Sequence, residues 1–153
     1  MKTSVIGFPR VGKLRELKFV TEKFFRGEAD VAELEKTGKE IRLEQWKWQK
    51  DGRIDFIPSG DFSFYDTILD AAVLFNIIPK RYKTLGLSEQ DTYFAMARGY
   101  QGAQGDVKAL AMKKWFNTNY HYMVPEIEDD TTISLAGNKL VDEYLEAKEN
   151  GFE

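Results

Sequence analysis

The stretch Ser-Val-Ile-Gly-Phe-Pro-Arg-Val-Gly-Lys-Leu-Arg-Glu-Leu-Lys, residues 4–18, decides the expected fold because it joins a short apolar segment to a helical one. Residues 4–8 predict a buried strand that ends in a turn at Pro9. From Lys13 the apolar side chains recur at helical spacing until Gly27, a typical helix stop. The stretch therefore predicts a strand, a loop and a helix, which is the repeating unit of an α/β protein.

The remainder of the chain predicts the same alternation. Asp30 and Glu33 form a capping-box pair that opens a second helix, expected to run to about Lys50. The glycine-rich residues 99–105 predict a loop. Further strands are expected at 54–57 and 119–124, and further helices at 64–75, 88–98 and 140–148.

Alternating strands and helices favour parallel pairing through right-handed crossovers. We therefore expect an α/β fold with about three parallel strands and flanking helices. The carboxyl ends of these strands would share one edge, where parallel α/β folds build their ligand sites. Three strands are too few to close a barrel, and 153 residues fall below the roughly 250 of a complete eight-stranded one.

The composition excludes several classes of function. A net charge of −3 provides no general positive field that would attract nucleic acid or an anionic membrane. The sequence also contains no run of about 18 apolar residues, the length that a helix needs to span a bilayer. The chain has no cysteine and a single histidine, His121, which excludes disulfides, thiolate nucleophiles and the usual transition-metal clusters within it. The first residues lack the pattern of a secretory signal, so we expect a cytoplasmic protein.

Four basic side chains surround the glycine turn and the start of the first helix: Arg10, Lys13, Arg15 and Lys18. Backbone N–H groups and the helix dipole favour an anion at such a place. The alternative is a solvated basic helix face, which charge alone favours. Spacing by itself leaves both interpretations open.

Residues 7–18 resemble the opening motif of the cobalamin-independent methionine synthases. Three further blocks resemble that family in the same order, at 60–66, 91–99 and 114–122. The resemblance implies that residues 1–153 are a single domain, the amino-terminal fragment of the family's folate-binding barrel. The implied fold is a partial (βα)8 TIM-type barrel.

The same resemblance implies a set of folate-binding residues. In the family, an Arg-Glu-Leu-Lys unit contributes to binding the folate substrate, and here this unit is Arg15, Glu16, Leu17 and Lys18. A lysine of the last block also meets the folate, and Lys114 occupies its position. Basic side chains suit a folate that carries several glutamates, because a polyanionic tail needs spaced Arg and Lys donors.

The implied activity is that of a zinc-dependent methyltransferase of methionine biosynthesis. The family moves a methyl group from 5-methyltetrahydrofolate polyglutamate to homocysteine, whose thiolate is activated by zinc in a carboxyl-terminal barrel. With no cysteine, this chain is expected to hold no cofactor and not to catalyse the transfer alone. Its expected partners are the folate and the carboxyl-terminal barrel of the same enzyme. The alternative is a stand-alone, non-catalytic binding or structural module that self-associates through exposed sheet edges.

Overall fold

The computed structural model describes residues 1–152 and contains two compact units. The first comprises residues 1–64 together with the chain from Asn138 onward, and the second comprises residues 65–137. Each unit has its own buried side chains and is described by itself. The single domain expected over residues 1–153 stays a prediction.

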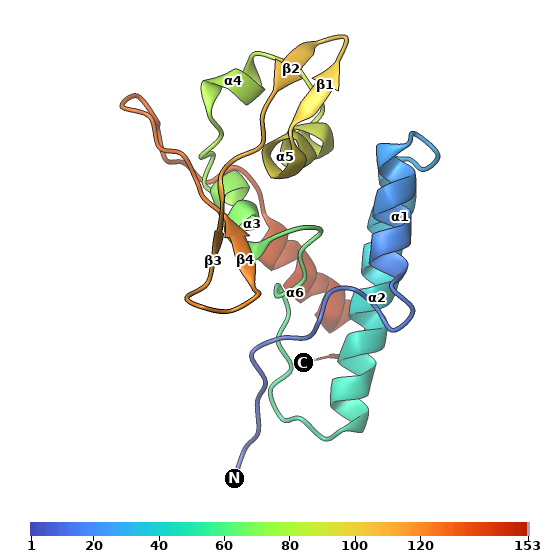
Figure 1. Cartoon of the computed structure of the whole chain (residues 1–153). Coiled ribbons are helices and arrows are strands. Elements are labelled where there is room, and N and C mark those ends of the chain that lie inside the picture. The colour runs from blue at the N-terminus through green and yellow to red at the C-terminus, as the bar shows by residue number, and fades with distance from the viewer. Residues whose placement is uncertain (153) are drawn as a thin grey trace. The chain divides into compact units, whose positions relative to one another are not determined.

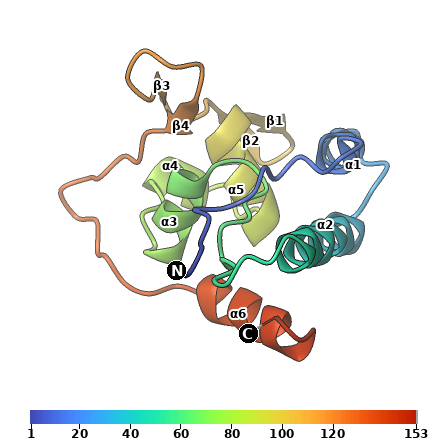
Figure 2. The same ribbon diagram turned by 90° about the horizontal axis from the view of Figure 1, so that it is seen from below.

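The first unit is built on three helices, α1 (Glu16–Phe25), α2 (Val31–Asp51) and α6 (Lys139–Glu149). Helix α1 lies along α2 (Figures 1 and 2). The expected cap of α2 is confirmed, since the Asp30 side chain accepts a hydrogen bond from the Glu33 N–H at 2.8 Å. The buried side chains between α1 and α2 recur at helical spacing: Leu17, Val20, Leu34 and Ile41.

Residues 58–64 pack against α2 through aromatic side chains. The buried Trp46 indole donates to the Pro58 carbonyl at 3.0 Å, so its polar atom is satisfied. A Cβ on Gly38 would lie 3.1 Å from the Phe64 ring and 3.2 Å from the Phe62 ring. A glycine in the middle of α2 therefore lets these two rings approach the helix closely.

The second unit contains α3 (Thr67–Leu74), α4 (Lys80–Lys83), α5 (Glu89–Arg98) and two hairpins. Strand β1 (Tyr100–Gly102) pairs with β2 (Gly105–Val107), and β3 (Met112–Lys114) pairs with β4 (His121–Met123), both antiparallel (Figure 1). Side-chain caps begin two of the helices, with Asp66 accepting from the Leu69 N–H and Ser88 accepting from the Asp91 N–H.

The expected sheet of about three parallel strands, and with it the partial (βα)8 TIM-type barrel, is wrong. The segments 4–8 and 54–57 meet in one isolated parallel bridge, between Ser4 and Phe56. The segment 119–124 contains β4, whose partner β3 lies just before it in the chain and runs antiparallel. A hairpin needs a short turn, whereas a parallel pair needs a crossover of a dozen or more residues, so local pairing replaces the expected sheet.

The glycine-rich segment 99–105 is also not a plain loop. It contains β1 and the turn of the first hairpin, in which Ala103 and Gln104 connect the paired Gly102 and Gly105. Gly105 has a φ of 125°, which a residue with a side chain rarely adopts. The glycines that predict a loop therefore make a two-residue hairpin turn.

Candidate anion-binding site at the start of α1

Arg15 stands immediately before α1 in a left-handed conformation. Its φ is 65° and its ψ is 33°, values that residues other than glycine adopt at a cost in free energy. Its N–H donates to the Gly12 carbonyl at 3.3 Å, which closes the turn that leads into the helix. The side chain is exposed beside the amino terminus of α1.

The Glu16 side chain stabilises the same turn through a hydrogen bond to its backbone. Its Oε2 atom accepts a hydrogen bond from the Leu14 N–H at 2.9 Å. A Cβ on Gly12 would lie 2.2 Å from this oxygen, and Gly12 itself has a φ of 80°. The turn therefore requires glycine at this position, and the Glu16 carboxylate holds its backbone.

The next two residues have different environments. Leu17 is 2% exposed and belongs to the core between α1 and α2, while its N–H donates to the Val11 carbonyl at 3.2 Å. Lys18 is exposed, and its Nζ lies 3.7 Å from the Glu22 carboxylate one turn further along. Such an exposed pair contributes little, so the Lys18 ammonium can exchange this partner for another anion.

The four basic residues around the turn fall into two groups. Arg10 donates to a backbone carbonyl at 2.8 Å. Lys13 donates to Glu44, and this hydrogen bond raises the pKa of Lys13 above its ordinary value. The Arg15 guanidinium, by contrast, has no hydrogen-bond or ion-pair partner among residues 1–152. Arg15 and Lys18 are therefore the two cations left available at the start of α1.

Lys114 lies in the second unit, at the end of β3. It is exposed and stands opposite His121 across the hairpin. Next to it the Trp115 and Tyr122 rings contact each other, with centroids 4.6 Å apart. The structure thus gathers Arg15 and Lys18 on one helix start and places the third expected cation on a hairpin with an aromatic cluster.

Comparison with known proteins identifies the family. Residues 2–153 match the family described as "Cobalamin-independent synthase, N-terminal domain". The chain belongs to this family. The resemblance seen in the four sequence blocks is therefore confirmed.

Relatives named 5-methyltetrahydropteroyltriglutamate–homocysteine methyltransferase are similar over the full chain. The protein of Campylobacter jejuni subsp. doylei is 58% identical over 153 residues, which are 100% of this chain and 20% of the relative. That of Streptococcus suis is 59% identical over 151 residues, 99% of this chain and 20% of the relative. The synthase-family chain thus spans about a fifth of the length of these relatives.

The resemblance implies zinc for the full family enzyme, but the described part of this chain does not fit a zinc site. Among residues 1–152 there is no group of three or more His, Cys, Asp or Glu side chains that could hold a metal ion. The sequence supplies no cysteine and one histidine. Among residues 1–152, no helix is long and apolar enough to cross a membrane.

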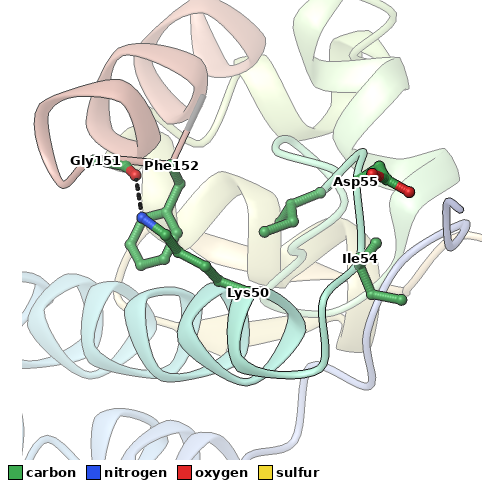
Figure 3. A pocket seen from close by; sticks show the side chains of 6 residues that line it. Lys50, Ile54, Asp55, Gly151 and Phe152 are labelled. Atoms are coloured by element: carbon green, nitrogen blue, oxygen red, sulfur yellow. Dashed lines mark hydrogen bonds between the residues drawn. The ribbon is translucent and has the colours of Figure 1, made fainter. Parts of the chain in front are cut away.

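A cavity of about 340 Å³ lies in the first unit near the end of α6 (Figure 3). Its polar groups are already engaged. The Lys50 ammonium donates to the Gly151 carbonyl at 2.8 Å and lies over the Phe152 ring, and the Asp55 carboxylate accepts from the Thr3 N–H at 2.7 Å. This cavity therefore offers a folate tail no free cation.

The structure adds a distinction that sequence reasoning missed. Spacing alone placed four cations at the start of α1, but Glu44 engages one of them from the middle of α2. The two residues are 31 positions apart, so no local pattern indicates the pairing. The same holds for Arg10, whose acceptor carbonyl lies 54 positions away.

Proposed function

We propose that this domain forms part of an enzyme that transfers a methyl group from 5-methyltetrahydropteroyltriglutamate to homocysteine, making methionine. Its part is to bind the glutamate tail of the folate through Arg15 and Lys18. The names of the full-length relatives support the reaction and its substrates. The observation that carries the residue assignment is the Arg15 guanidinium, exposed and without a partner among residues 1–152, at a helix amino terminus.

The chemistry of the tail suits this arrangement. A guanidinium binds a carboxylate through two parallel hydrogen bonds, and a lysine ammonium serves as a point charge for another. The positive end of the helix dipole adds a favourable field in the first turn. In this proposal Glu16 and Leu17 contribute by shaping the turn and the core beneath it, since their side chains are engaged there.

Lys114 supplies a further cation to the folate in this proposal. Its exposed position on β3 leaves the ammonium free to approach a carboxylate. The transfer itself belongs to the rest of the polypeptide, which supplies the zinc and the homocysteine site. The domain therefore acts as a binding element whose partners are the folate and the remainder of its own enzyme.

A fused enzyme tests the assignment. In it, this chain replaces the matching segment of the Campylobacter jejuni relative, so that the complete enzyme is assayed. Arg15→Ala and Lys18→Ala each remove a charge-assisted hydrogen bond of about 1.5–3 kcal/mol, so the KM for the triglutamate folate should rise roughly tenfold or more. The kcat at saturation should not change, because the tail is bound equally in the ground and transition states.

The matched comparison uses substrate and residue controls. With a monoglutamate folate the two variants should change KM by less than about twofold, since the missing glutamates are those that the cations hold. Lys39→Ala, which removes an exposed charge on α2, should leave both substrates unaffected. Equal increases in KM for the two folates would reject the tail-binding role.

A further inference from the structure

Helix α6 carries its large apolar side chains on its exposed face. Leu140, Val141, Tyr144 and Leu145 are 55%, 56%, 50% and 46% exposed. Their spacing of one, four and five residues places them on a single side of the helix. In a globular protein, a helix packs such an apolar face against the core.

The opposite face of α6 is charged and buried. Glu143 is 7% exposed, and the Glu146 carboxylate accepts from Arg42 of α2 at 2.7 Å, with both of these side chains less than 15% exposed. Lys139 pairs with Glu143 at 3.0 Å and donates to the Phe62 carbonyl at 2.7 Å. Turning the apolar face inward would break these buried pairs, so the observed orientation of α6 is fixed.

The end of α6 directs the chain back towards the helix. Gly151 adopts a φ of 79°, and the Phe152 N–H donates to the Ala147 carbonyl at 3.0 Å, as in a glycine-stopped helix. The Phe152 ring then packs 5.8 Å from the Trp46 ring, centroid to centroid. The last described residue therefore lies against α2.

We infer that the exposed face of α6 is a docking surface for the polypeptide that follows this domain in its full-length enzyme. The occupant is an apolar segment of the same chain, beyond residue 153. The family match describes an amino-terminal domain, and the relatives are about five times as long, so most of the polypeptide lies outside it. This inference rests on membership of the family and not on folate binding.

Thiol labelling tests the docking surface. The chain contains no cysteine, so Tyr144→Cys or Leu140→Cys gives the 153-residue protein one reactive thiol. A maleimide should label it freely in the 153-residue protein and at least about tenfold more slowly in the fused enzyme, where labelling at this position is read by peptide mass spectrometry. Asp142→Cys, an exposed position on another side of the same helix, should react at similar rates in both proteins.

Two outcomes would overturn the inference. Equal labelling of the Tyr144→Cys and Leu140→Cys variants in the 153-residue protein and the fused enzyme would show that the face stays open to solvent. Slow labelling in the 153-residue protein, together with a solution mass of two chains, would assign the face to a second copy. Folate affinity enters neither measurement, so a failure here would leave the proposed function standing.

Discussion

Arg15 combines a strained backbone conformation with an exposed guanidinium. A left-handed conformation costs a residue with a side chain about 1–2 kcal/mol of free energy. The Arg15 guanidinium has no partner among residues 1–152 that would offset this cost. Strain of this kind is maintained by the surrounding structure and is frequent at functional positions. The turn held by Glu16 and Gly12 supplies that surrounding structure here.

Replacing Arg15 with glycine should separate stability from binding. Glycine relieves the left-handed strain but loses about 0.5–1 kcal/mol of backbone entropy, so Arg15→Gly should leave the free energy of unfolding unchanged or raise it by up to about 1 kcal/mol. In the fused enzyme the same variant should raise the KM for the triglutamate folate as Arg15→Ala does. Urea unfolding of the 153-residue protein measures the first effect, and a loss of more than about 1 kcal/mol would show that the guanidinium supports the fold.

The pair between Arg81 and Glu126 makes the stability of the second unit depend on pH. The Arg81 hydrogen bond lowers the pKa of Glu126 below its ordinary value of 4.5. Because the unfolded chain then binds the proton more tightly, the pair stabilises the fold above that value, and the stabilisation is lost as the pH falls through the lower folded pKa.

Glu126→Gln should therefore destabilise the protein at pH 7 and have progressively less effect below about pH 4.5. Both side chains are more than a third exposed, so the difference at pH 7 should not exceed about 1 kcal/mol. Unfolding by urea at a series of pH values measures it, with Glu35→Gln on the exposed part of α2 as the control. A difference that grows on acidification would contradict the assignment of the pair.

At the scale of the elements, local signals predicted α1, α2, α3, α5, α6 and the position of β4, but they predicted neither α4 nor the pairing of the strands. Caps and stops are local signals, and Asp30, Ser88 and Gly151 mark helix ends close to the expected residues. Pairing partners are not local. Residues 54–57 have the composition of a strand but form only one isolated β-bridge, through Phe56. Strand β3 contains Lys113 and Lys114, a residue type that does not by itself predict a strand.

The pair between α2 and α6 could not be predicted either, because Arg42 and Glu146 are 104 residues apart. Removing one member leaves a buried charge uncompensated, so Arg42→Met or Glu146→Leu alone should each cost about 3–5 kcal/mol. The double variant should lose less free energy of unfolding than the two single variants together. If the new side chains pack well, it should lose less than either single variant. A double-mutant cycle by urea unfolding measures the coupling, and additive losses would mean that the pair contributes nothing jointly.

At the scale of the whole molecule, the family was readable from the sequence, while the fold and the available cations were not. Four ordered blocks indicated the synthase family, and the match over residues 2–153 confirmed it. The local hairpins and the engagement of Lys13 by Glu44 depend on contacts in space, which spacing does not encode. The assignment of folate binding to Arg15, Lys18 and Lys114 stays a prediction.

We propose that this synthase-family domain contributes binding to a methyl transfer that the rest of the enzyme performs. The most direct test measures methionine formed from homocysteine and 5-methyltetrahydropteroyltriglutamate, with zinc supplied, by the purified 153-residue protein and by the fused enzyme side by side. We predict methionine from the fused enzyme and none from the 153-residue protein, which has no cysteine to bind the metal. Methionine formed by the 153-residue protein alone would contradict the claim.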